Sequence, residues 1–352
     1  LKDAAAMHFR VGEAWHTLSW ADYATRSRRF AAALIANGYQ PGQGLAILSD
    51  NCPEWLIAEI GAMRARAVAA GIYQTCTPEQ TAYIIQHCEA PVVIVQDPSQ
   101  WTKVSAQRTH LPCLRKVIVL HGADGIDDAM VCDFDSFLAE GDAHLDAADA
   151  RFAELEDDDL AVLIYTSGTT GPPKGVMLSH HNLAWTAKQT NAAVGATVSE
   201  EDCVVSYLPL SHIAEQLFSI HLPATYGFPV WFAGSVDRLK DTMIAARPTL
   251  FLAVPRVWEK FKAALEGKLN EASGLKATIV AWARGVGTQA GPRLIETGEL
   301  GGFLGVKYAI ANRLFFGKLT AQLGLDRLKL AITGAAPIGT DVLEFFMSCG
   351  II

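Results

Sequence analysis

The sequence has few of the features that mark a secreted, metal-binding or nucleic-acid-binding protein. Its seven cysteines are scattered, odd in number and never spaced C-x-x-C, so we expect neither a disulfide framework nor a zinc site. A net charge of −8 and the absence of a basic cluster argue against nucleic acid as a partner. The composition therefore favours a reducing, cytoplasmic setting.

Long apolar runs are also missing. The first thirty residues carry charges throughout and do not have the pattern of a secretory signal. Between Asp202 and Asp237 the only formally charged side chain is Glu215, but three prolines and two histidines interrupt the segment. No apolar run reaches the roughly 18 residues that a spanning helix needs. We interpret this segment as buried core rather than as a membrane span. Peripheral association of the protein with a membrane stays open.

Helical and strand patterns alternate at short intervals over the first 150 residues. Ser19 and Asp22 form a capping-box pattern for a helix to about Asn37, and further helices are expected after residue 51, after residue 77 and at 133–140. Apolar or β-branched runs predict strands at 45–48, 92–95 and 117–120. This alternation predicts an α/β fold with mostly parallel sheets flanked by helices.

The acidic segment 146–159 suggests where the chain is divided. We expect a first α/β subdomain at 1–150 and a second at 151–352, with the acidic segment as a linker or, alternatively, as a solvated helix face. After it come a strand at 160–165 and a strand at 176–178 that enters a helix near residue 179. An apolar strand at 207–210 and a strand at 328–333 are expected further along.

The segment 163–175, LIYTSGTTGPPKG, joins the strands at 160–165 and 176–178. Its glycines allow backbone N–H groups to turn toward an anion, its hydroxyls add donors and its lysine adds a positive charge. It does not fit the Walker spacing, because Pro173 stands where that pattern needs glycine. The segment predicts a nucleotide triphosphate site formed by Thr166, Ser167, Gly168, Thr169, Thr170, Gly171, Lys174 and Gly175.

Residues 165–180, YTSGTTGPPKGVMLSH, resemble the signature of the adenylate-forming, AMP-binding superfamily. Three further segments follow in the order that its long-chain fatty acid–CoA ligases use: LPLSHIAE at 208–215, the gate-like VPRVWEK at 254–260 and TGAAP at 333–337. The early ILSDNCPEW at 47–55 is also similar to the family. The resemblance implies the fold of the large N-terminal domain of acyl-CoA synthetases, incomplete at its C-terminal side.

That resemblance also implies a reaction and its cofactors. The family joins a carboxylate to the α-phosphate of ATP with loss of pyrophosphate and then transfers the acyl group to CoA, using Mg²⁺. By resemblance Thr166 helps to hold Mg²⁺, residues 167–171 wrap the phosphates, Lys174 adds charge and His212 lies near the α-phosphate and acyl carbonyl. The adenine would lie against Gly334, Ala335, Ala336 and Pro337.

Each of these assignments has a plainer alternative. Lys174 would otherwise be a solvated surface lysine, His212 a satisfied core histidine and Glu215 part of a local network rather than a partner that orients His212. Trp258 is either the gate of an acyl tunnel or a core residue. The long, aromatic-rich segment between Trp258 and Gly334 favours a long-chain fatty acid as substrate, because its helices could shape an acyl tunnel. The alternatives are that these helices lie on a membrane surface or simply pack against each other.

Other functions and assemblies stay open at this point. The alternatives are an acyl- or aminoacyl-adenylating enzyme that loads a carrier protein, and a non-catalytic nucleotide- or lipid-binding module; a homodimer is also open. The family's Tyr-Gly-x-x-Glu element, its ribose-binding Asp, its hinge and its small C-terminal domain have no match in these residues. We therefore expect this chain alone to bind nucleotide weakly and to form no thioester.

Overall fold

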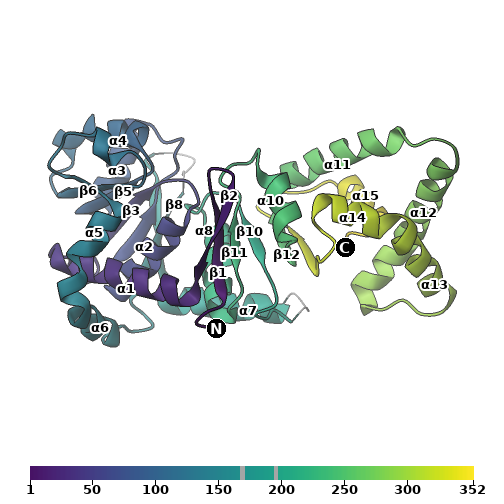
Figure 1. The fold of residues 1–352 in the computed structure, drawn as a ribbon, viewed down its shortest axis with the longest axis horizontal. Coiled ribbons are helices and arrows are strands. Elements are labelled where there is room, and N and C mark those ends of the chain that lie inside the picture. Colours follow the sequence, from purple (N-terminus) through teal and green to yellow (C-terminus); the bar gives the residue numbers. More distant parts are fainter. Residues whose placement is uncertain (167–170, 194–196) are drawn as a thin grey trace. The chain divides into compact units, whose positions relative to one another are not determined.

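The computed structural model describes residues 1–166, 171–193 and 197–352 of the chain (Figure 1). It is an α/β structure with mostly parallel strands flanked by helices, as predicted. The chain forms two compact units: residues 1–200 with 206–236, and residues 201–205 with 237–352. The division therefore falls elsewhere than the boundary at residue 150 that the sequence suggested, and strands from both sides of residue 150 share one sheet.

A seven-stranded sheet is the main element of the first unit. Its strands run in the order β7-β6-β5-β3-β4-β8-β9, parallel except for β9, which is antiparallel to β8. Every side chain in the central strands β3, β4 and β5 is buried, as expected for a sheet covered on both faces. The strands are β3 Gly44–Leu48, β4 Val68–Gly71, β5 Val92–Val95, β6 Lys116–Val119, β7 Val131–Asp133, β8 Leu160–Thr166 and β9 Lys174–Ser179.

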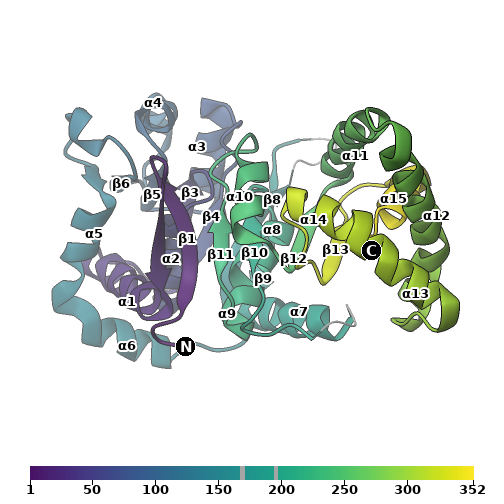
Figure 2. The ribbon, with the colours of Figure 1, turned by 45° about the vertical axis from the view of Figure 1, so that its right-hand side comes forward.

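Helices cover this sheet on its two faces (Figures 1 and 2). On one face, alternate strand residues such as Leu48 and Val95 pack with α3 and α4 in a single apolar cluster, while α1 packs against α2, α5 and α6. The capping box predicted at Ser19 is present, and the helix expected after residue 77 begins with a second box at Thr77, so both helix starts are fixed by local sequence. The helices are α1 Trp20–Ala36, α2 Pro53–Arg64, α3 Pro78–His87, α4 Pro98–Ser105, α5 Phe134–Glu140 and α6 Leu145–Ala153, with 3₁₀ turns at Arg108–His110, Ala123–Gly125 and Asp142–His144.

The acidic segment 146–159 is held to the first unit by ion pairs. Its first part is helix α6, where the carboxylate of Asp149 accepts bonds of 2.6–3.0 Å from the Arg28 guanidinium and lies 3.2 Å from Arg64. Asp159 is paired with Arg66 at 2.9 Å. The segment is therefore a solvated helix face followed by a turn, and the linker interpretation is wrong.

A smaller sheet in the order β10-β11-β1-β2 completes the strands of this part of the chain. The strand predicted at 207–210 is instead β10, Val204–Ser206, and the next residues form a turn because Pro209 has no N–H for a strand ladder. The other elements are β1 Ala5–Val11, β2 Ala14–Ser19, β11 Val230–Phe232, α7 His180–Ala193, α8 Ile213–Gln216, a π-helix Leu217–His221 and α9 Leu222–Tyr226.

The second unit consists mainly of helices around two parallel strands, β12 Leu250–Ala253 and β13 Leu330–Thr333. Among the described residues, no helix is both long enough and apolar enough to cross a membrane. The helices are α10 Leu239–Ala246, α11 Pro255–Asn270, α12 Gly274–Thr297, α13 Gly302–Ala311, a π-helix Asn312–Phe316, α14 Gly317–Leu323 and α15 Thr340–Ser348.

A buried carboxyl group in α2 makes the stability of the first unit depend on pH. Glu59 is fully buried, and its Oε2 accepts a 3.1 Å hydrogen bond from the Trp55 indole. Its Oε1 lies 3.9 Å from Nε2 of His221, and neither atom has a hydrogen-bond partner among the described residues. Burial raises the pKa of Glu59 to about 8 and lowers the pKa of His221 to about 4.

We expect Glu59→Gln to remove a loss of stability that the native chain shows between pH 6.5 and 8. In this window the unfolded chain has lost the Glu59 proton while the folded chain keeps it, so stability falls as pH rises. The His221 ring acts in the opposite sense, but only below pH 6.5. Between pH 6.5 and 8 the free energy of unfolding of the variant should rise by about 2 kcal/mol relative to that of the native chain. Urea unfolding at both pH values measures this gain, and the surface variant Glu89→Gln should show none.

Candidate functional site

The predicted phosphate segment is the connection of a β-hairpin. Thr166, the last residue of β8, pairs with Lys174, the first residue of β9, and both side chains are exposed. Gly171 has φ +99, a conformation that favours glycine, and a Cβ added there would meet no described atom within 4 Å. Ser167, Gly168, Thr169 and Thr170 lie outside the described residues.

Tyr165 fixes the base of this hairpin, a role that sequence reasoning missed. Its hydroxyl is 2.8 Å from Nδ1 of His87 on α3, and its ring would lie 3.3 Å from a Cβ at Gly175. Gly175 is therefore the residue that lets the tyrosine ring lie across the two strands. The tyrosine directly before the glycine-rich segment was the only sequence signal for this contact.

The turn that carries His212 lies at the carboxyl edge of the same sheet. Gly71 in β4 is paired with Ile164 in β8, and a Cβ at Gly71 would be 2.8 Å from Cα of Ser211. Ile213 packs against the cluster that contains Ile164. Because β4 and β8 are parallel, their carboxyl ends lie at one edge, which is where open α/β sheets bind ligands. The structure thus brings His212 to the edge from which the glycine-rich segment leaves.

His212 itself is exposed, so it is not the buried core histidine of the plainer alternative. It is the N-cap residue of α8, and its Nδ1 accepts a 3.1 Å hydrogen bond from the Ala214 N–H. In the neutral ring this bond requires the proton to be on Nε2. His212 therefore presents Nε2–H as a fixed hydrogen-bond donor.

Glu215 belongs to a local network rather than to His212. Its Oε1 accepts hydrogen bonds of 2.7 Å from Ser206 and 2.7 Å from Ser219, and one of 3.2 Å from the Tyr207 N–H. Full burial raises the pKa of Glu215 to about 7, while these donors act to lower it. The structural interpretation of Glu215 is confirmed: the residue ties β10 and the following turn to the π-helix.

Asn51 holds the same turn from the other side. It lies between the end of β3 at Leu48 and the start of α2 at Pro53, and its Nδ2 donates to the carbonyl oxygen of Leu208 at 2.7 Å and to Ser206 Oγ at 2.8 Å. Its Oδ1 accepts from the Leu210 N–H at 3.1 Å. The sequence marked residues 47–55 only as family-like, and the contact with Leu208 now gives that segment a function in the fold.

Two predicted site segments lie in the second unit. Residues 334–337 follow β13, and Ala335, Ala336 and Pro337 are exposed. Ala335 has φ +69, which costs energy for a residue with a Cβ, and a Cβ at Gly334 would meet no described atom within 4 Å. This turn therefore offers a small-residue backbone surface at the carboxyl end of a parallel strand.

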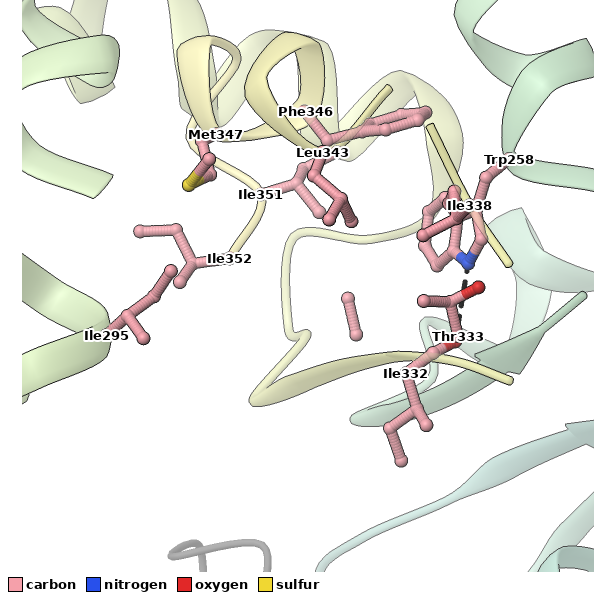
Figure 3. A pocket seen from close by; sticks show the side chains of 11 residues that line it. Trp258, Ile295, Ile332, Thr333, Ile338, Leu343, Phe346, Met347, Ile351 and Ile352 are labelled. Carbon is pink, nitrogen blue, oxygen red and sulfur yellow. Dashed lines mark hydrogen bonds between the residues drawn. The ribbon is translucent and has the colours of Figure 1, made fainter. Parts of the chain in front are cut away.

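Trp258 at the start of α11 is buried, and it also lines a pocket (Figure 3). Its indole N–H donates to the carbonyl oxygen of Ile332 at 3.3 Å, and its ring meets Phe346 edge-on at 4.9 Å between centroids. The pocket has a volume of about 300 Å³, and none of the described residues that line it is ionisable. Its walls include Ile295 from α12 and Leu343 from α15. Trp258 is thus both a packed residue and part of an apolar pocket wall.

The described side chains could hold Mg²⁺ only together with the phosphate groups of a bound nucleotide. Within the described part of the chain, no group of three or more His, Cys, Asp or Glu side chains could hold a metal ion. Thr166 supplies one exposed hydroxyl at the mouth of the hairpin. Mg²⁺ is commonly bound by few protein oxygens together with substrate phosphates and water, so this hydroxyl is compatible with such a site.

Residues 1–352 match the family model described as AMP-binding enzyme, and the chain belongs to that family. Its members are ATP-dependent ligases.

Curated relatives agree with this assignment. The chain is 38% identical over 360 residues to the long-chain-fatty-acid–CoA ligase ACSBG2 of Xenopus laevis, covering 99% of this chain and 48% of the relative. It is 34% identical to the human ligase of the same name, covering 98% of this chain and 52% of the relative. The chain spans about half the length of these relatives.

Two solved structures share the fold. ATP-bound MatB from Rhodopseudomonas palustris aligns with a TM-score of 0.67 at 22% identity, covering 98% of this chain and 55% of that one. The adenylation domain of a carboxylate reductase from Mycobacterium chelonae aligns with a TM-score of 0.70 at 20% identity, covering 99% and 54%.

We expect Asn51→Ala to destabilise the first unit by about 2 kcal/mol, because it leaves partly buried backbone groups of the 207–210 turn without partners. Chemical unfolding monitored by circular dichroism measures the change. The matched variant is Asn37→Ala at the end of α1, where Asn37 Nδ2 donates to Glu140 at the surface and to the carbonyl oxygen of Ala33. That variant should cost less than about 1 kcal/mol. Equal losses in the two variants would mean that the Asn51 bonds do not hold the turn.

Proposed function

We propose that the protein activates a long-chain fatty acid with ATP and then transfers the acyl group to CoA. In the first step a carboxylate oxygen attacks the α-phosphorus, the bond to the bridging oxygen breaks and pyrophosphate leaves. In the second step the CoA thiolate attacks the acyl carbon and AMP leaves. The observation that carries the proposal is the exposed Nε2–H of His212 at the sheet edge from which the Thr166–Lys174 hairpin connection leaves.

The first step brings two anions together, so the site must supply positive charge and hydrogen-bond donors. Lys174 provides charge at one side of the connection, and the backbone of residues 167–171 would wrap the β- and γ-phosphates. His212 Nε2–H would donate to an α-phosphate oxygen or to the acyl carbonyl. The Thr166 hydroxyl with phosphate oxygens would hold Mg²⁺, which when bound would offset the charge of the phosphates.

The second unit supplies candidate surfaces for the adenine and the acyl chain. The exposed backbone at Gly334–Pro337 would take the adenine ring, since small side chains leave room for a flat base. The apolar pocket beside Trp258 would take an acyl tail, and its apolar lining among the described residues disfavours an amino-acid substrate. The names of the relatives at 32–38% identity favour the same choice of substrate and of CoA as acceptor.

The substrate proposal is tested by ATP–pyrophosphate exchange in the full-length protein. Exchange should depend on a fatty acid of long chain and should be absent with acetate or with an amino acid. The acceptor is tested separately by formation of acyl-CoA. Exchange with an amino acid alone, or acyl transfer only to a carrier protein, would contradict the proposal.

His212→Ala should lower fatty-acid-dependent exchange by roughly 10²-fold, because the variant loses the fixed donor at the reacting phosphate. Its thermal stability should fall only slightly, because His212 is exposed and contributes one capping hydrogen bond of about 1 kcal/mol. The control is His181→Ala, which removes another exposed histidine of the same unit. Unchanged exchange in His212→Ala would remove His212 from the site.

A further inference from the structure

Helix α13 exposes a continuous row of large apolar side chains. Phe303, Val306, Ile310 and Leu314 are exposed by 73%, 57%, 47% and 43%, and together they form what we call the α13 face. Their spacing of three and four residues places them along one side of α13 and the π-helical turn that follows. The buried residues of this stretch include Phe315 and Phe316, so its opposite side already supplies the packing. The α13 face is therefore not needed for the core of the unit.

The stretch of chain that forms the α13 face carries only positive charge. Lys307 lies over the Phe303 ring, with Nζ 4.6 Å from its centroid, and Arg313 and Lys318 are exposed. Residues 300–325 contain these three cations and no Asp or Glu. The chain as a whole carries 37 acidic and 29 basic residues, so this stretch is opposite in sign to the rest.

A hollow of about 540 Å³ continues the same surface toward α11 and α12. Leu314 and Lys318 from the α13 stretch line it, together with Lys268, Leu275 and Lys276. Leu275 is 77% exposed, and none of the described residues that line the hollow is acidic. The apolar floor and its lysines thus extend the character of the α13 face over neighbouring helices. Figures 1 and 2 show α13 next to α12 at one margin of the second unit.

Charge decides which partner fits this surface. A symmetric contact between two copies of the chain would place the same apolar row, with its lysines and arginine, against itself, and like charges would face each other. A bilayer rich in anionic lipid offers the complementary arrangement, with acyl chains for the apolar row and negative headgroups for the cations. Exposed aromatic and aliphatic side chains with basic residues beside them are the composition of helices that lie in a membrane interface.

We propose that the α13 face docks peripherally on the surface of an anionic membrane. Phe303, Val306 and Ile310 enter the boundary between headgroups and acyl chains, and Lys307, Arg313 and Lys318 lie at the level of the headgroup phosphates. The docking does not require the adenylation reaction, and it rests only on the exposed residues and charges of this stretch.

The test is sedimentation of the chain with lipid vesicles. The vesicles consist of phosphatidylcholine alone or of phosphatidylcholine with about one third phosphatidylserine, a content chosen to give a negative surface potential. The native chain should bind the anionic vesicles, and high salt should weaken the binding. Phe303→Ser with Lys307→Gln should lower vesicle affinity about tenfold or more, since it removes one inserted ring and one cation.

A matched double variant separates this effect from general surface stickiness. Helix α7 also exposes an aromatic and a lysine one turn apart, so Trp185→Ser with Lys188→Gln makes equivalent changes elsewhere, and its affinity should equal that of the native chain. If the Phe303 variant proves unfolded by circular dichroism, Ile310→Ser with Arg313→Gln provides the second measurement. Free inorganic phosphate should not compete at concentrations where the vesicles bind.

Three outcomes would overturn the proposal. The first is no binding to anionic vesicles, and the second is equal binding to neutral vesicles. The third is self-association, detected by light scattering and abolished by the Phe303 variant, without vesicle binding; this would make the α13 face an interface between copies. None of these outcomes bears on fatty-acid-dependent exchange, so failure here leaves the proposed function standing.

Discussion

The turn at residues 207–212 carries backbone groups that neither a helix nor a strand satisfies, and side chains of Asn51 and Glu215 satisfy them instead. Asn51 bonds to the carbonyl of Leu208 and the N–H of Leu210, while Glu215 accepts from the Tyr207 N–H. Buried backbone groups without partners are costly, so these bonds determine where the turn can lie. The position of His212 at the sheet edge follows from them.

Two buried carboxyl groups in the first unit show how hydrogen-bond donors affect the pKa of a buried acid. Glu215 accepts from two hydroxyls and a backbone N–H, and its pKa reaches about 7; Glu59 accepts a single indole bond, and its pKa reaches about 8. Burial favours the neutral acid in both, and hydrogen bonds to the carboxylate work against burial. In both groups burial outweighs the hydrogen bonds and raises the pKa, and Glu215 has more hydrogen-bond donors to oppose this shift than Glu59 has.

Local sequence predicted much of this fold because the signals that define its elements are local. The boxes at Ser19 and Thr77, the buried strands and the β8–β9 hairpin are all set by neighbouring residues. The prediction of a strand at 207–210 was wrong, because it relied on the apolar residues of this segment and gave too little weight to Pro209, which has no N–H for a strand ladder. Asn51 was missed for a different reason: its partner Leu208 is 157 residues away, and no periodicity reports such a contact. The roles of Thr166, Lys174 and His212 stay predictions, since the geometry gives them exposure and position but not a ligand.

The long segment between Trp258 and Gly334 shows why an apolar stripe alone does not identify its partner. From sequence, Phe303, Phe315 and Phe316 are equivalent members of one aromatic-rich stretch. Helix packing is the commonest explanation of such a stretch, but a tunnel wall and a membrane surface are also compatible with it. In the structure Phe315 and Phe316 are buried while Phe303 is exposed beneath Lys307. Once packing has taken one side of the helix, the residues left outside need a separate explanation, because large exposed apolar patches are uncommon on soluble surfaces. Here the charges beside them, all positive in an acidic chain, point to an anionic surface rather than to a second copy.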